Sequence, residues 1–103
     1  MNTLERLAAT IESRKGADPD SSWTAKLFSK GANKCAQKFG EEAIEACMAV
    51  ASDDRDNLIY ESADVLYHLL VMLTAKGVTL DEVLAELERR EGTSGITEKA
   101  SRG

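Results

Sequence analysis

The sequence predicts an all-α protein: a bundle of about four to five helices that form one domain. Apolar residues recur at intervals of three and four positions in several segments, as they do on one face of a helix. No segment alternates apolar and polar residues for long enough to predict a strand. A length of 103 residues suits a single domain, and a core this small would be completed by a second copy of the chain, so we expect a homodimer.

The first helix is predicted from an apolar stripe close to the N-terminus. The members of the stripe are Leu4, Leu7, Ala8 and Ile11. Asn2 or Thr3 would cap this helix. It should stop near Gly16, because residues 16–22 collect turn-forming residues and the only proline of the chain.

A short helix and a long helix are predicted next. Residues 22–28 begin with Ser22, whose hydroxyl can cap a helix, and Gly31 would end or kink this segment. The long helix covers residues 33–51, where apolar residues continue at helical spacing despite Gly40 inside the run.

The compact connection at residues 52–54 leads into a second long helix, which is rich in leucine and is closed by Gly77. Because the connection is short, the two long helices should be antiparallel neighbours. Thr79 and Glu82 match a capping box, which predicts a last helix that runs to about Arg90.

Composition also limits where the protein works. Residues 92–103 are small and polar, so we expect a flexible tail after a domain formed by residues 1–91. The longest uncharged apolar stretch, residues 65–75, is too short to span a bilayer, and the first residues lack the pattern of a secretory signal. We therefore expect a cytoplasmic protein with no membrane partner. Cys35 and Cys47 lie at positions compatible with burial and are expected to be free core thiols.

Four acidic residues form the most informative pattern in the sequence. Glu42 and Glu45 lie three positions apart in the first long helix, and Glu61 and Asp64 repeat this spacing in the second. Residues three apart share a helix face, so an antiparallel hairpin could bring the two pairs together. Four converging carboxylates repel one another unless cations bind between them. The sequence therefore predicts a metal site.

The donor atoms indicate which metal would bind. Hard oxygen ligands favour Mg²⁺, or Mn²⁺, over zinc, and Mg²⁺ is commonly shared with substrate phosphates. Di-iron bundles need two Glu-x-x-His motifs, but the one histidine, His68, has no glutamate three positions before it. A solvated acidic face is the remaining alternative, and the strongly apolar helix that carries Glu61 and Asp64 speaks against it.

A basic segment precedes the acidic one. The net charge of −5 opposes binding of nucleic acid to the surface as a whole. Residues 14–38 nevertheless carry six basic residues against two acidic ones. Three of the lysines recur every four positions and would form one strip if the helix continued through Gly31. The candidates for phosphate binding are Arg14, Lys26, Lys30, Lys34 and Lys38, with an ordinary solvated strip as the alternative.

The acidic and basic patterns together resemble a known family. Glu41-Glu42-x-x-Glu45 followed by Glu61-x-x-Asp64 is similar to the metal-binding signature of the all-α nucleoside triphosphate pyrophosphohydrolases, the MazG-like and dimeric dUTPase superfamily. Within it, nearly the whole chain resembles the phosphoribosyl-ATP pyrophosphohydrolases of histidine biosynthesis. This closer resemblance is carried by residues 22–27 (Ser-Trp-Thr-Ala-Lys-Leu), Gly31, Lys34, Gln37, Lys38, residues 63–68 (Ala-Asp-Val-Leu-Tyr-His), Gly77 and Val78. The chain departs from the family at Trp23, where tyrosine is usual.

The resemblance implies hydrolysis of the α–β phosphoanhydride of phosphoribosyl-ATP, which gives phosphoribosyl-AMP and pyrophosphate. The predicted metal ligands and catalytic residues are Glu42, Glu45, Glu61 and Asp64, joined in catalysis by Glu41. The predicted substrate contacts are Arg14, Trp23, Thr24, Lys26, Lys30, Lys34 and Lys38. The alternatives are a house-cleaning nucleoside triphosphate pyrophosphohydrolase of the same superfamily and a non-catalytic helical interaction module.

Overall fold

The computed structural model describes residues 1–92, and these residues form five α-helices and no strand. The helices are α1 (Thr3–Ser13), α2 (Trp23–Ser29), α3 (Ala32–Ala51), α4 (Arg55–Ala75) and α5 (Leu80–Arg89). The predicted all-α bundle is confirmed. The flexible tail predicted at residues 92–103 lies, apart from its first residue, outside the described residues.

Local side-chain signals begin four of the five helices. The side chain of Asn2 accepts a hydrogen bond from a backbone N–H in the first turn of α1, and Ser22 and Asp54 do the same for α2 and α4. Thr79 and Glu82 form the predicted capping box of α5. These caps satisfy backbone donors that a helix start leaves unpaired, which explains why the predicted and observed helix starts agree.

Gly31 separates α2 from α3. Its φ angle of 95° belongs to the left-handed region that glycine adopts readily, and no atom lies close to where a Cβ would be. The requirement for glycine is therefore conformational. Helical structure does not continue through this residue, so the single lysine strip does not form. Lys30 ends α2, whereas Lys34 and Lys38 belong to α3.

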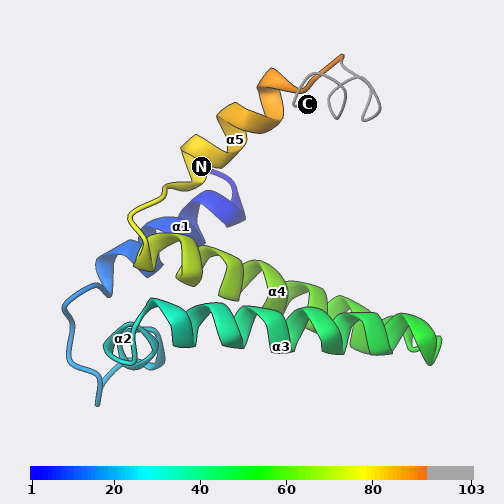
Figure 1. Ribbon diagram of the computed structural model, residues 1–103, viewed down its shortest axis with the longest axis horizontal. Coiled ribbons are helices and arrows are strands. Elements are labelled where there is room, and N and C mark those ends of the chain that lie inside the picture. The colour runs from blue at the N-terminus through cyan, green and yellow to red at the C-terminus, as the bar shows by residue number, and fades with distance from the viewer. Residues whose placement is uncertain (93–103) are drawn as a thin grey trace.

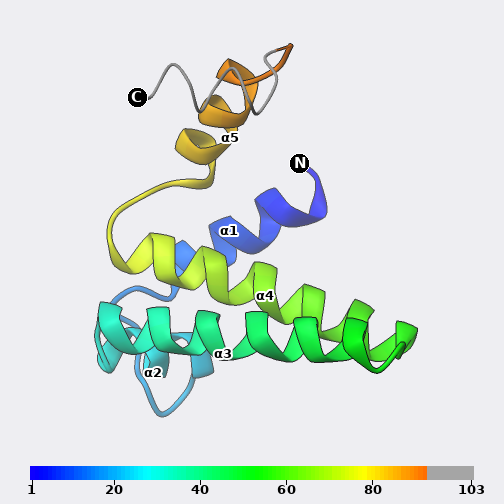
Figure 2. The same ribbon diagram turned by 45° about the vertical axis from the view of Figure 1, so that its right-hand side comes forward.

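α3 and α4 form a long antiparallel hairpin on which the other helices are arranged (Figure 1). α1 packs beside the C-terminal half of α4, and α2 packs against both long helices near the start of α3. Figure 2 shows the same arrangement turned by 45°, with α5 projecting away from the hairpin. Only one end of the hairpin is therefore covered by other helices.

The covered end of the hairpin, here called the closed end, contains the core. Its most deeply buried side chains come one from each of the first four helices: Ile11, Leu27, Cys35 and Val71. α5 has no buried residue, although Leu80 at its start packs against this core. Burial of these side chains is the main source of stability within one chain.

The other end, residues 43–66, is here called the open end because no third helix covers it. Its exposed large apolar residues are Ile44, Met48, Val50, Ile59, Tyr60 and Leu66. α4 is apolar and long enough to cross a membrane by length and composition, a test that core helices also pass, and only 22% of its apolar window is buried in one chain. The buried Glu61 and His68 face the bundle and identify α4 as a bundle helix.

The two cysteines differ in burial, so one prediction about them is wrong. Cys35 is fully buried, and its Sγ donates to the backbone oxygen of Leu27 at 3.5 Å. Cys47 is exposed. Twelve residues at about 100° each leave the two thiols roughly 120° apart around α3, and only one of these directions faces the core.

Candidate active site

Three of the four predicted metal ligands meet between α3 and α4. Glu42 and Glu45 from α3 and Glu61 from α4 each offer a carboxylate oxygen, and these three atoms lie within 4.8 Å of one another. The three carboxylates are here called the acidic group. Asp64 lies outside it, one helical turn after Glu61, and acts on Glu42 and Glu61 through its charge.

Glu61 is the most unusual member of the acidic group because it is buried. Glu61 is only 7% exposed, and its Oε2 has no hydrogen-bond partner. A buried carboxylate oxygen without a partner is costly, and a proton or a cation would relieve that cost. The orphaned oxygen points to a missing positive charge at this place.

The pKa values indicate the same need. Burial, followed by hydrogen bonding to Glu45 and Glu61 and repulsion from Glu45 and Asp64, raises the pKa of Glu42 to about 7. Burial and then Glu45 also raise the pKa of Glu61. A proton on Glu42 is therefore favoured below about pH 7 when no metal is bound, and it would offset part of the mutual repulsion. Three hard oxygen donors from two helices suit Mg²⁺, or Mn²⁺, as the positive charge that would take the place of the proton.

Glu41 behaves differently from its neighbour Glu42. The side-chain amide of Gln37 donates to Oε1 of Glu41 at 3.0 Å, and Nζ of Lys38 lies 3.3 Å from its Oε2. These two contacts lower the pKa of Glu41, which is exposed. Glu41 is therefore an ionised surface group outside the acidic group, and it restrains Lys38.

His68 continues the buried side of α4, one turn beyond Asp64. It is 5% exposed, its Nδ1 has no hydrogen-bond partner, and burial, aided by the charge of Lys38, lowers its pKa. The ring of Tyr67 meets the imidazole edge to face, with centroids 4.9 Å apart and planes at 76°. The imidazole is neutral at neutral pH and is a packed part of the bundle.

α2 presents an aromatic and cationic surface. Trp23 is 52% exposed, and Nζ of Lys30 lies 5.6 Å from the centroid of its ring. Lys26 shares this exposed face, since the three residues follow helical spacing. An open pocket beside them is lined by Pro19, Asp20, Ser21, Ser22, Trp23 and Lys26. Such a surface suits a planar base or a phosphate.

Thr24 makes a contact that sequence reasoning missed. Its Oγ1 lies 2.6 Å from Oη of Tyr67, although 43 positions separate the two residues. Both lie in the runs that carry the family resemblance, but nothing in their spacing predicts a contact. Of the remaining predicted residues, Lys34 is partly buried on α3 and Arg14 is exposed at the end of α1.

Comparison with known proteins decides the family. The family model described as phosphoribosyl-ATP pyrophosphohydrolase matches residues 4–91, which include every predicted site residue. The chain belongs to the phosphoribosyl-ATP pyrophosphohydrolase family. Similar proteins named phosphoribosyl-ATP pyrophosphatase occur in Rhodobacter capsulatus, at 72% identity, and Cereibacter sphaeroides, at 71%, both over the full length of the two chains. One from Dinoroseobacter shibae is 70% identical over 99% of this chain and 100% of its own.

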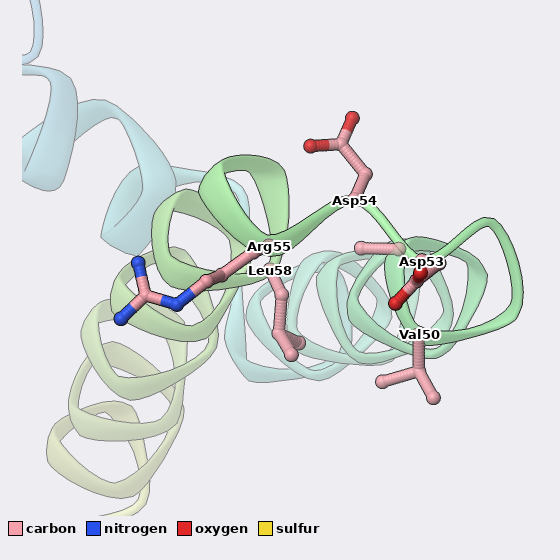
Figure 3. A pocket seen from close by; sticks show the side chains of 6 residues that line it. Val50, Asp53, Asp54, Arg55 and Leu58 are labelled. Carbon is pink, nitrogen blue, oxygen red and sulfur yellow. The ribbon is translucent and has the colours of Figure 1, made fainter.

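A surface pocket of this phosphoribosyl-ATP pyrophosphohydrolase family member lies at the turn between α3 and α4 (Figure 3). It is lined by Ala49, Val50, Asp53, Asp54, Arg55 and Leu58. Figure 3 shows the side chains of Asp54 and Arg55 pointing in different directions. None of the predicted site residues lines this pocket, so the acidic group and the surface of α2 remain the candidate site.

Proposed function

We propose that this chain hydrolyses the α–β phosphoanhydride of phosphoribosyl-ATP in the cytoplasm, as a step of histidine biosynthesis. One water molecule is consumed as the anhydride bond breaks, and phosphoribosyl-AMP and pyrophosphate leave as products. Family membership and the names of the relatives support the substrate. The observation that carries the reaction type is the acidic group, with its orphaned oxygen on Glu61.

The cofactor in this proposal is Mg²⁺, with Mn²⁺ able to replace it. Glu42, Glu45 and Glu61 would hold it, with Asp64 as a further ligand or as a nearby countercharge. When bound, a divalent cation neutralises phosphate charge and lowers the pKa of a bound water molecule. The chain itself supplies a rigid hairpin that presents carboxylates from both sides.

The basic residues divide between two helices in this proposal. The surface of α2 would bind the base of the substrate and the phosphate of its phosphoribosyl group, through Trp23, Lys26 and Lys30. On α3, Lys34 and Lys38 would offset the charge of the triphosphate, and Glu41 would fix the direction of Lys38. Positioning and charge neutralisation dominate phosphoryl transfer, so no covalent nucleophile is required.

The functional form in this proposal is a homodimer joined at the open end. An almost entirely apolar groove there is lined by Ala43, Ala46, Ser62, Val65 and Leu66. Exposed apolar side chains continue along both helices beyond the groove. A second hairpin would cover this surface and form a four-helix bundle, which is a common way for antiparallel helices to bury apolar faces.

Pyrophosphate release tests substrate, reaction and cofactor together. The purified protein is incubated with phosphoribosyl-ATP or with each nucleoside triphosphate, in Mg²⁺, in Mn²⁺ and in excess chelator. We expect release from phosphoribosyl-ATP that depends on the metal. Preference for a free triphosphate would identify a house-cleaning enzyme, and no release from any substrate would favour an interaction module. Undiminished release in chelator would refute the metal site.

A further inference from the structure

The hydroxyl groups of Thr24 and Tyr67 form the one side-chain hydrogen bond that joins α2 to α4 among the described residues. Its oxygens are 2.6 Å apart and partly buried. Partial burial makes this bond costly to break, because the two hydroxyl groups would then be poorly placed to bind water. The bond therefore favours one orientation of α2 over others. The ring of Tyr67 is held in turn by its edge contact with His68.

α2 depends on contacts of this kind for its orientation. It has seven residues, and a helix so short is not stable by its own hydrogen bonds. Gly31 at its end permits many directions of the chain, and the loop of residues 14–22 precedes its start. Ala25 and Leu27 bury one side of α2, but apolar packing alone is not directional. The Thr24–Tyr67 hydrogen bond is directional, so it selects one orientation of α2 relative to α4.

The bond also connects the two halves of the candidate site. Tyr67 lies three residues after Asp64, one turn along the helix that carries Glu61. Thr24 lies beside Trp23 and within a turn of Lys26 on the helix that carries the aromatic and cationic surface. The Thr24–Tyr67 bond therefore lies where α2 meets α4, and it helps to fix the distance between the acidic group and the surface of α2.

We infer that Thr24 and Tyr67 are positioning residues, which fix α2 relative to the acidic group so that the substrate spans both. This inference rests on the proposed function. In this inference Thr24 orients the binding surface of α2, whereas the sequence predicted that Thr24 contacts the substrate directly. The acidic group belongs to α3 and α4 alone, so loosening α2 weakens substrate binding and leaves the metal ligands in place.

The kinetic test uses Tyr67→Phe, Thr24→Val and the double variant, all as full-length protein. Loss of one hydrogen bond should raise KM for phosphoribosyl-ATP about five- to tenfold, with kcat changed less than about twofold. The double variant should match the single ones, because each removes the same bond. Thr24→Ser keeps the hydroxyl and should restore KM. Thr10→Val, at an exposed position on α1, is the matched control.

A second measurement reports on α2 without substrate. Trp23 is the only tryptophan, so its fluorescence anisotropy decay follows the motion of α2. Tyr67→Phe and Thr24→Val should increase this motion while helix content and Mn²⁺ affinity stay constant. Additive KM effects, an unchanged KM beside a lower Tm, or unaltered Trp23 motion would each overturn the inference. If the wild-type protein fails to hydrolyse phosphoribosyl-ATP, the proposed function fails, and the Trp23 measurement still decides whether the bond holds α2.

Discussion

The two ends of the α3–α4 hairpin are built from similar apolar helices but differ in what covers them. At the closed end, α1 and α2 bury Leu27, Cys35 and Val71 completely. At the open end, side chains such as Met48 and Leu66 remain largely in solvent. One chain therefore covers only half of its hairpin, and in the proposed dimer a second copy covers the other half.

The acidic group lies at the border of the open end: Glu45 and Glu61 belong to residues 43–66, and Glu42 directly precedes them. This position explains its electrostatics. Glu61 is buried, whereas Glu45 is exposed, although one carboxylate oxygen of each belongs to the same group. A carboxylate that is half withdrawn from water strongly favours a cation, and an open side allows a large substrate to reach it. The boundary between a dry and a wet region is thus a suitable place for metal-assisted hydrolysis.

The largest expected effect comes from removing a charge at this boundary. Glu61→Gln should reduce kcat/KM for phosphoribosyl-ATP by about a thousandfold, because the site loses a charged ligand in a poorly solvated place. The metal-free protein should be as stable as the wild type or more stable, since repulsion is removed. Kinetics and thermal unfolding measure the two effects. Glu12→Gln on the exposed side of α1 is the control, and activity within tenfold of wild type would contradict the metal site.

A pair of truncations compares the ends directly. Leu27→Ala at the closed end should lower the free energy of unfolding by about 3 kcal/mol, as large-to-small changes in tight cores do. Ile44→Ala at the open end should cost less than about 1 kcal/mol, because the side chain is 63% exposed in one chain. Urea unfolding at low protein concentration gives both values, since a second copy then contributes least. Equal losses would remove the distinction between the ends.

The association of the open end is tested by a charge in its groove. Leu66→Glu should shift the protein from dimer to monomer in sedimentation velocity, because a carboxylate would be buried without a partner in the joined grooves. Folding of the single chain should survive, since Leu66 is 46% exposed there. Leu66→Met keeps an apolar side chain of similar size and should remain dimeric. A wild-type monomer at micromolar concentration would refute the proposed dimer.

Features set by neighbouring residues were predictable from the sequence. Helix starts followed from short-range hydrogen bonds such as that of Ser22, and the antiparallel hairpin followed from a three-residue connection. The acidic pairs followed from spacing on a helix face. The sequence also named Gly31 as a possible end of α2, but only its φ angle shows that the lysines on either side belong to different helices.

Features set by the rotation of one helix against another were not predictable. Spacing placed Glu61 and Asp64 on one face of α4, yet only Glu61 reaches the acidic group, because the contact with α3 selects one direction. The same rotation buries Cys35 and exposes Cys47. The hydrogen bond from Thr24 to Tyr67 joins distant segments and depends on the complete packing of α2.

The smallest expected effect is a pH dependence of the free energy of unfolding, which should differ between Glu42 in the acidic group and Glu86 on α5. The pKa of Glu42 is about 7 in the folded chain, against an ordinary value of 4.5. Between pH 4.5 and 7 the folded state therefore holds a proton that the unfolded state has released. Stability of the metal-free protein from this residue is full below pH 4.5 and is lost as the pH rises towards 7. Mg²⁺ should reverse this loss, because it replaces the proton.

Glu42→Gln tests this dependence through the difference in stability between wild type and variant across pH 4.5 to 7. A difference is needed because the lowered pKa of His68 acts in the opposite direction: its stabilisation grows as pH rises towards 6.5. Glu86→Gln is the control, since Arg89 lowers the pKa of Glu86 to about 2 and its contribution is lost only as pH falls below 4.5. We expect the wild type to lose stability relative to Glu42→Gln as pH rises through this window, because Gln does not titrate, and the Glu86 difference to stay constant. If both stayed constant, Glu42 would be an ordinary surface carboxylate, and the boundary between the two ends would have no electrostatic consequence.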